Sequence, residues 1–291
     1  MKRRLNSLCT ALLASLVLAA CGHVPTTAPW TAAQQRQLEE LLPAGALLLG
    51  EQHDAPEHHL LERQVVEWLA KRGSLAAVAI EMAPRGKDTR ALPSQAPEAE
   101  VQKALDWNNA GWPWETYGPV VMAAVRLGVP VLGANLPAAE QRSAMSDSSL
   151  EARLAADALA TQQQRIRDGH CNLLPSTQIL PMTRIQIARD LAMAKTLADA
   201  RKSGQTVLLI AGNGHVEREL GVPVHLPADL GVKVISAQAG QPTSEEGDQA
   251  RARVRTSADL VWPTPALPPK DYCAQFRGSV KSRPSTKGPQ E

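Results

Sequence analysis

Aromatic residues, net charge and long apolar runs are all scarce in this sequence. One Phe, two Tyr and six Trp make up 3% of its 291 residues, and the formal net charge is +2. The apolar run at residues 8–20 is shorter than the roughly 20 residues that a membrane-spanning helix needs. The charge balance gives no support to nucleic-acid binding, and the short run argues against an anchor made of a spanning helix.

This short apolar run is typical of a signal peptide at residues 1–20. Lys2-Arg3-Arg4 precedes it, and it ends in Leu18-Ala19-Ala20-Cys21, which resembles a bacterial lipobox. The resemblance implies cleavage before Cys21 and acylation of its thiol and new amino group. Because Gly22 follows rather than Asp, it also implies the outer membrane, with the protein facing the periplasm. Two or more acyl chains would anchor it stably. An ordinary secretory signal with a chance cysteine is the alternative.

Removal of the leader changes the charge and the cysteine inventory. The three cations at positions 2–4 leave with it, so the net charge falls from +2 to −1, and the pI of 8.4 belongs partly to the leader. Cys9 leaves and Cys21 is lipidated, so Cys171 and Cys273 remain in an oxidising compartment. We predict that these two form a disulfide, closing a loop of about 100 residues worth roughly 4–5 kcal/mol in the chain-entropy model. Two buried free thiols are the alternative.

The mature chain alternates short apolar runs with segments of helical periodicity. The runs predict strands at 46–49, 75–80, 129–133, 206–211, 232–237 and 259–262. Helices are expected at 32–42, 60–69, 117–127 and 182–202, an exposed helical insert at 137–167, and loops at 89–98, 170–181 and 241–248. This alternation predicts one α/β domain over residues 32–278, with a central, mostly parallel sheet flanked by helices. A spacer at 21–31 precedes it and a disordered tail at 279–291 follows it.

Two Gly-x-x-His segments follow two of the predicted strands. They are Gly50-Glu51-Gln52-His53 and Gly212-Asn213-Gly214-His215. Glu81 and Asn135 follow two further apolar runs. Ligands of open α/β sheets bind at the carboxyl edge of the strands, so these four segments are expected to converge on one site.

The chemistry of that site has more than one interpretation. The imidazoles of His53 and His215 with the carboxylates of Glu51 and Glu81 suit zinc, manganese or iron. Alternatively no metal binds and Glu51 only orients His53, or both histidines cap strand ends through backbone hydrogen bonds. His58 and His59 lie in the first turn of a helix, where only one of them can face His53, so one is expected to line the site and the other to be exposed.

Half of the tryptophans lie in one short segment, residues 107–117, together with Tyr117. Such a cluster can build a wall of a flat apolar pocket, for which Trp112 and Trp114 are candidates, or it can be a satellite core beneath a loop. A tyrosine phenolate can also ligate ferric haem iron. The other tyrosine is Tyr272, next to Cys273, so Tyr117 is the better candidate.

Several motifs, in order from about residue 44 to 235, together resemble one family. They are Leu48-Leu49-Gly50-Glu51-Gln52-His53-Asp54 with His58-His59, Ile80-Glu81-Met82, Trp114-x-x-Tyr117-x-Pro119, Gly133-x-Asn135, Gln186-x-x-Arg189-Asp190-x-x-Met193-Ala194, and Ala211-Gly212-Asn213-Gly214-His215-Val216 with Gly221-Val222-Pro223. On these motifs the chain is similar to the ChaN-like haem-binding lipoproteins.

The resemblance implies an α/β fold, a periplasm-facing lipoprotein and a role in haem or iron acquisition. It further implies that haem lies between two subunits, with a tyrosine ligand from one and a histidine nearby from the other. Carried onto this chain, these roles fall on Tyr117 as iron ligand and on His53 or His58, with Trp112, Trp114 and Asn135 as further candidates around the haem. Dimerisation would then be linked to haem binding.

The same resemblance extends to Tiki-type metalloproteases and erythromycin-esterase-like hydrolases, which also use paired Gly-x-x-His motifs and a glutamate. It makes Glu51, His53, Glu81 and His215 the candidate catalytic residues of a metal-dependent hydrolase, in which the ion would lower the pKa of a bound water. Two hypotheses therefore stand beside the haem-binding lipoprotein: such a peptidase or esterase, and an envelope interaction protein with an inert site.

The disulfide prediction is checked by counting thiols in the unreduced, unfolded mature protein. We expect none from Cys171 and Cys273, because the periplasm oxidises paired cysteines. Two titratable thiols would contradict the bridge.

Overall fold

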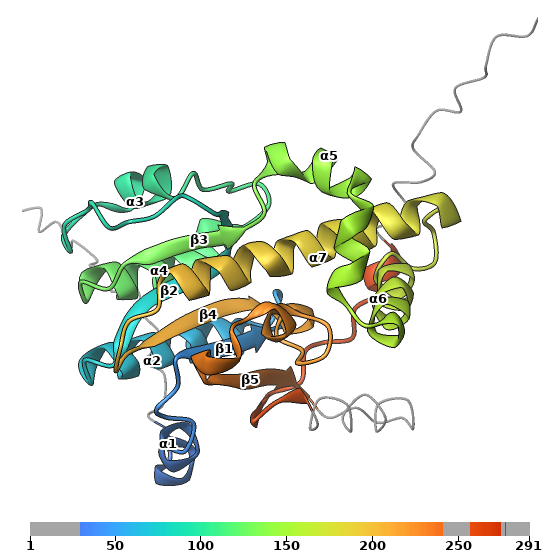
Figure 1. Cartoon of the computed structure of the whole chain (residues 1–291). Coiled ribbons are helices and arrows are strands. Elements are labelled where there is room, and N and C mark those ends of the chain that lie inside the picture. Colours follow the sequence, from blue (N-terminus) through green and yellow to red (C-terminus); the bar gives the residue numbers. More distant parts are fainter. Residues whose placement is uncertain (1–29, 241–256, 275–276, 278–291) are drawn as a thin grey trace, which may run out of the picture.

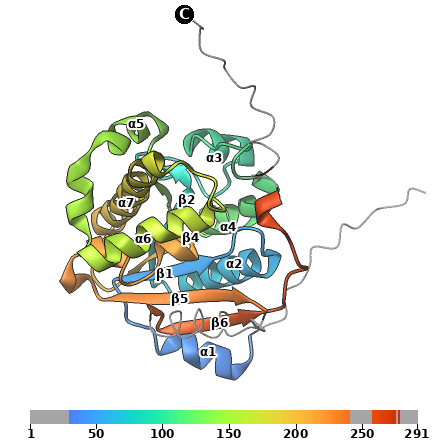
Figure 2. The same cartoon turned by 90° about the vertical axis from the view of Figure 1, so that its right-hand side faces the viewer.

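A sheet of six parallel strands forms the centre of the structure (Figures 1 and 2). The computed structural model describes residues 30–240, 257–274 and 277. In these residues the strands are β1 (Ala46–Glu51), β2 (Leu75–Pro84), β3 (Val131–Asn135), β4 (Thr206–Gly212), β5 (Val232–Ala239) and β6 (Leu260–Thr264). Their order across the sheet is β3-β2-β4-β1-β5-β6. The predicted α/β class with a central parallel sheet is confirmed.

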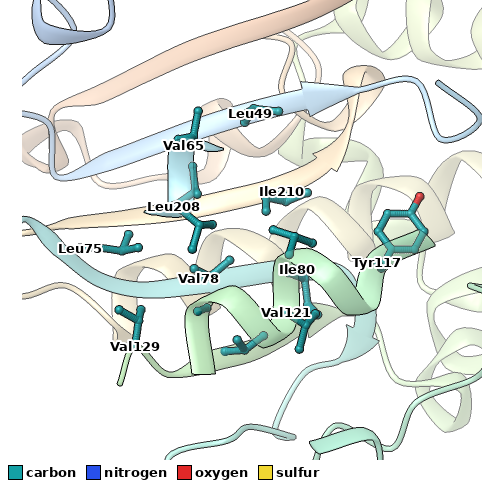
Figure 3. Close-up of a cluster of buried hydrophobic side chains, with 14 of the residues drawn as sticks. Leu49, Val65, Leu75, Val78, Ile80, Tyr117, Val121, Val129, Leu208 and Ile210 are labelled. Carbon is teal, nitrogen blue, oxygen red and sulfur yellow. The ribbon is translucent and has the colours of Figure 1, made fainter. Parts of the chain in front are cut away.

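The two faces of the sheet are covered by different helices. Helices α2 (Pro56–Lys71) and α4 (Trp114–Arg126) pack on one face, and α7 (Ser176–Asp199) packs on the other (Figures 1 and 2). The alternation of β1 explains this division, since Leu47 and Leu49 join the first core and Ala46 and Leu48 join the second. Figure 3 shows the first core, which ends at Tyr117 near the carboxyl ends of the strands.

The predicted helical insert packs on α7 rather than on the sheet. It consists of α5 (Ala138–Ser146), the 3₁₀ segment η1 (Ser148–Arg153) and α6 (Ala156–Gly169). Leu150 of η1 and Leu154, which follows it, form a third apolar cluster with Ile187 of α7. The remaining elements are α1 (Ala32–Glu39), α3 (Glu98–Ala104), η2 (Asn213–His215), η3 (Val222–His225) and η4 (Ala228–Leu230).

Several sequence-based boundaries are wrong, two of them at the start of a helix that has a proline nearby. The loop expected at 170–181 ends early, because α7 begins at Ser176 and contains Pro181. Pro181 lies beyond the first turn and removes one intrahelical hydrogen bond, but the helix continues because apolar residues on both sides of it, Ile179 and Ile185, are buried. Helix α4 begins at Trp114, not at residue 117, because Pro113 is well suited to the residue that precedes a first turn.

The predicted disulfide is present in the structure and ties α6 to the C-terminal segment. It joins Cys171, just past α6, to Cys273, with their Cα atoms 5.7 Å apart. The signal peptide, the lipidation residue Cys21, the spacer up to residue 29, and the predicted tail at 279–291 all lie outside the described residues. Within the described part of the chain, no helix is long and apolar enough to cross a membrane.

The close approach of β2 and β3 depends on a glycine, which gives a test of the fold. A Cβ at Gly133 would lie 2.1 Å from the carbonyl oxygen of Pro84, so Gly133→Ala must push the two strands apart. We expect it to lower the free energy of unfolding by about 1–3 kcal/mol, the usual cost of overpacking. Denaturant unfolding measures this. Gly169→Ala is the matched control, because a Cβ there meets nothing within 4 Å; equal stability of the two variants would contradict this packing.

Candidate functional site

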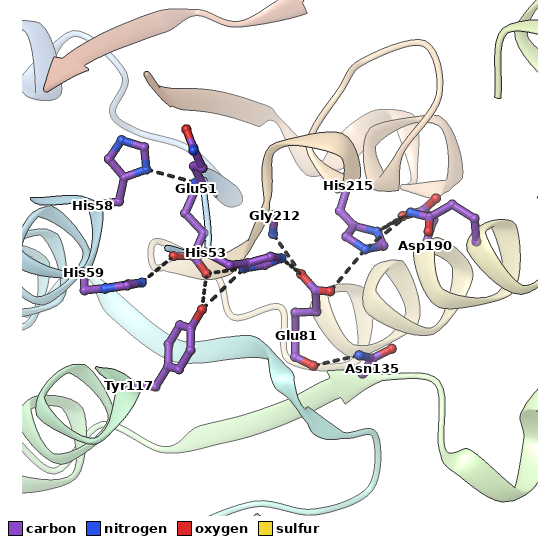
Figure 4. Close-up of polar contacts among 12 residues, drawn as sticks. Glu51, His53, His58, His59, Glu81, Tyr117, Asn135, Asp190, Gly212 and His215 are labelled. Carbon is purple, nitrogen blue, oxygen red and sulfur yellow. Dashed lines mark hydrogen bonds and ion pairs between the residues drawn. The ribbon is translucent and has the colours of Figure 1, made fainter. Parts of the chain in front are cut away.

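The four polar groups expected at the sheet edge do lie together there (Figure 4). Because all strands are parallel, the ends of β1, β2, β3 and β4 meet at one edge. The glycines of the two Gly-x-x-His motifs allow the motifs to pack against each other. A Cβ at Gly212 would lie 2.8 Å from Nε2 of His53, and a Cβ at Gly50 would lie 2.5 Å from Oδ1 of Asn213. Each glycine is therefore needed where the other motif approaches.

Glu51, the last residue of β1, is the centre of the first group of contacts. Its Oε1 lies 2.8 Å from Nδ1 of His53 and accepts a hydrogen bond of 3.0 Å from the hydroxyl of Tyr117. Its Oε2 lies 3.0 Å from Nε2 of His59 on α2. The Glu51 side chain is fully buried, whereas the His53 side chain is 42% exposed. A buried carboxylate thus orients a histidine that reaches the surface.

These contacts determine the protonation of the group. Burial acts to raise the pKa of Glu51, but the hydrogen bond with His53 and the nearby imidazole of His59 outweigh it and hold that pKa well below its usual value. Burial acts to lower the pKa of His53, yet the hydrogen bond to Glu51 and the charge of Glu81 leave it raised. Burial and the charge of Glu51 raise the pKa of Tyr117 far above its usual value. In the unliganded protein Tyr117 is therefore a neutral hydrogen-bond donor.

Glu81 on β2 is the centre of the second group. Its Oε2 accepts a hydrogen bond of 2.8 Å from the backbone N–H of Gly212, and its Oε1 lies 3.4 Å from Nε2 of His215. The other nitrogen of His215, Nδ1, lies 2.5 Å from Oδ1 of Asp190 on α7. Oε2 of Glu81 also lies 3.8 Å from Nε2 of His53, which links the two groups.

Charge compensation is strong in this second group. Burial disfavours the imidazolium of His215, but the charges of Glu81 and Asp190 raise its pKa to about 10. Burial alone would raise the pKa of Glu81, which His215 instead lowers to about 2. Burial raises the pKa of Asp190 to about 6, against the opposing effect of His215. His215 is thus a buried imidazolium between two carboxyl groups.

This arrangement does not support the metal-hydrolase interpretation. Both nitrogens of His215 already lie against carboxylate oxygens, those of Glu81 and Asp190. Among the described residues, the ligand atoms of the four candidates do not meet at one point: these are His53, His215, Glu51 and Glu81. Three ligand atoms do lie close together elsewhere, on Glu51, His59 and Glu62.

An open cavity of about 700 Å³ lies beside His53. Its polar groups include His53 and Tyr117, and its apolar wall includes Trp112, whose ring centroid is 4.9 Å from that of His53. Leu60 of α2 adds to the wall, and Arg63 of the same helix also lines the cavity. The volume falls within the range of small-molecule and cofactor sites.

Three of the expected haem contacts do not face this cavity. His58 is fully buried; its Nδ1 accepts a hydrogen bond from the backbone N–H of Gln52, so its Nε2 carries the proton and donates to Thr264. Burial lowers its pKa to about 4, which keeps the ring neutral. Trp114 is buried and donates to Glu98. Asn135 donates to the backbone carbonyl of Glu81 and so positions β2.

Three members of the site were not predicted from the sequence: His59, Glu62 and Asp190. His59 was expected only as an alternative to His58, with one of the two exposed, but neither is exposed. Glu62 shares the buried face of α2 with Leu61, Val65, Val66 and Leu69. An acidic residue within an apolar helical stripe is a pattern that could have identified it.

The C-terminal segment reaches the first Gly-x-x-His motif. The hydroxyl of Tyr272 donates to Oδ2 of Asp54 at 3.0 Å and accepts from the Gln52 side chain at 3.0 Å. Lys270 forms an ion pair of 2.9 Å with the same oxygen of Asp54. Since Cys273 follows directly, the disulfide holds this contact in place.

Comparison with known proteins places the chain in a family. The family model described as haem-binding uptake, Tiki superfamily, ChaN matches residues 37–226, which is more than half of the sequence. The chain therefore belongs to this ChaN family, as its motifs predicted. No curated protein sequence matches it.

Among solved structures, the chain is similar to ChaN of Campylobacter jejuni, whose structure is described as cofacial heme binding. The two are 22% identical, the match covers 72% of this chain and 87% of that one, and the TM-score is 0.58. The type III effector HopBA1 matches with 14% identity, 77% and 88% coverage and a TM-score of 0.41. The first likeness supports the fold, and the second is too weak to support an argument.

The buried imidazolium gives a test of the electrostatics. The pKa of His215 is raised in the folded state above the unfolded value of about 6.5. Its stabilising contribution is therefore complete below about pH 6.5 and is lost as the pH rises toward 10. NMR of the imidazole should show it protonated at pH 8, and Asp190→Asn should lower its pKa. His170→Gln, outside the cluster, should leave that titration unchanged; a His215 that titrates near 6.5 would contradict the account.

Proposed function

We propose that this protein binds haem in the cavity between α2 and α4. The observation that carries the proposal is the cavity itself, where an apolar wall meets a tyrosine and a histidine, the side chains that most often ligate haem iron together with cysteine and methionine. Membership of the ChaN family also supports haem as the ligand. Burial of the porphyrin against Trp112 and Leu60 would supply most of the affinity.

Tyr117 is the proposed iron ligand and His53 its partner. The Tyr117 hydroxyl lies 3.4 Å from Nδ1 of His53, and both residues line the cavity. Because burial and Glu51 raise the pKa of Tyr117, the hydroxyl would lose its proton only when a strong Lewis acid such as ferric iron bonds to its oxygen. Glu51 and His53 are placed to receive that proton. Arg63, whose guanidinium is held by Glu67 at the same helix face, can pair with a haem carboxylate.

The cellular role follows from the sequence. A lipidated Cys21 would hold the protein at the outer membrane, facing the periplasm, where haem or iron passes during uptake. Because the cavity is open on one side, a bound haem would retain an exposed face, which a second copy of the chain could cover. Haem binding would then promote a homodimer.

The proposal is tested by titrating ferric haem into the purified protein and following its absorbance. We expect saturation and a phenolate-to-iron charge-transfer band. Tyr117→Phe should remove the band and weaken binding by roughly tenfold or more, because the only anionic ligand is lost. Tyr272→Phe is the matched control, since Tyr272 is the other tyrosine and does not line the cavity.

The His53→Ala variant assigns the ligand. Haem binding that persists in Tyr117→Phe, shows no phenolate band in the unaltered protein and is lost in His53→Ala would instead assign the iron to the histidine. No saturable binding in the unaltered protein would contradict the proposed function itself.

A further inference from the structure

Four buried polar atoms without hydrogen-bond partners lie together behind the haem cavity. They are Oε2 of Glu51, Nε2 of His59, and both carboxylate oxygens of Glu62. Buried polar groups are almost always hydrogen-bonded, because an unpaired one costs free energy. Four of them in one place therefore indicate a missing partner.

These atoms have the geometry of ligands to one ion. One ligand atom from each of Glu51, His59 and Glu62 lies within 4.8 Å of the others. Nε2 of His59 and Oε2 of Glu51 are 3.0 Å apart, yet they are not aligned as a hydrogen bond. Two ligands of a shared cation have this arrangement, because their polar atoms point at the ion rather than at each other.

The secondary structure presents these groups from two rigid elements. Glu51 ends β1, and His59 and Glu62 are three residues apart on α2, on the same side of the helix. The other oxygen of Glu51 is already occupied by His53 and Tyr117, so only Oε2 faces α2. The geometry of the set is thus fixed by its surroundings rather than by an ion.

Glu62 is the residue that requires an explanation. It is 0% exposed, and no cationic side chain is paired with it among the described residues. The carboxyl group of Glu51 lies beside it, and two ionised carboxylates at this separation in the interior require a cation between them. Buried charge of this kind is normally neutralised by a partner or a metal.

We propose that Glu51, His59 and Glu62 bind one divalent first-row transition ion, with zinc as the first candidate and manganese as the second. Two carboxylates neutralise the charge of the ion, and an imidazole with two carboxylates is a ligand set that suits these metals. This site is separate from the Glu81–His215 group and does not depend on haem binding. It is a structural centre that fastens α2 to the end of β1.

The experiment loads the chelator-stripped mature protein with Zn²⁺ or Mn²⁺, and measures bound metal by equilibrium dialysis with elemental analysis. We expect about one equivalent per chain and a higher midpoint of thermal unfolding with metal than without. Glu62→Gln keeps the shape but removes the charge, so it should weaken binding by roughly tenfold or more and abolish the thermal shift. Glu67→Gln, the same substitution on the same helix outside the cluster, should bind metal normally.

The outcomes are distinguishable from a failure of the haem proposal. Sub-stoichiometric metal, with no thermal shift and with Glu62→Gln as stable as the unaltered protein, would overturn the site and assign the cluster to a proton shared by the two carboxyl groups. Metal that is lost in His215→Asn but retained in Glu62→Gln would overturn it in favour of the other group. Neither result bears on whether Tyr117→Phe weakens haem binding.

Discussion

The burial of Glu51 at the end of a central strand is the constraint on which the rest of this site depends. An ionised carboxylate in the interior is costly unless hydrogen bonds and positive charge surround it. His53, Tyr117 and His59 provide those contacts, and each comes from a different element: the loop after β1, α4 and α2. The buried charge at the sheet edge thereby fixes the positions of three residues that line the cavity.

The two histidines of the repeated motif have different environments despite their common spacing. His53 is partly exposed beside a cavity, whereas His215 is enclosed by Glu81 and Asp190. The difference arises from α7, which carries Asp190 and covers only one face of the sheet. The buried imidazolium of His215 then holds Glu81 in place, and the charge of Glu81 acts to raise the pKa of His53. The first motif therefore places His53 beside the cavity, and the second motif holds in place the carboxylate that interacts with His53.

The strands and their common edge could be predicted from the sequence because short apolar runs and parallel topology depend on local pattern. The convergence of Glu51, His53, Glu81 and His215 followed from that topology alone. The orientation of His58 and His59 could not be predicted, since helical phase decides it and Pro56 fixes the start of the helix only approximately. Asp190 and Glu62 were missed for a related reason: their charges become informative only when a helix face is known to be buried. The start of α7 was predicted too late, because the residues up to Pro181 were assigned to a proline-containing loop.

The central claim is that haem occupies the cavity beside His53, with its iron at Tyr117. A crystal structure of the protein with ferric haem tests it most directly. The account predicts the porphyrin against Trp112, the iron bonded to the Tyr117 oxygen, and Glu51 still buried beside them. Haem bound elsewhere on the chain, or iron bonded to a residue outside this cavity, would contradict it.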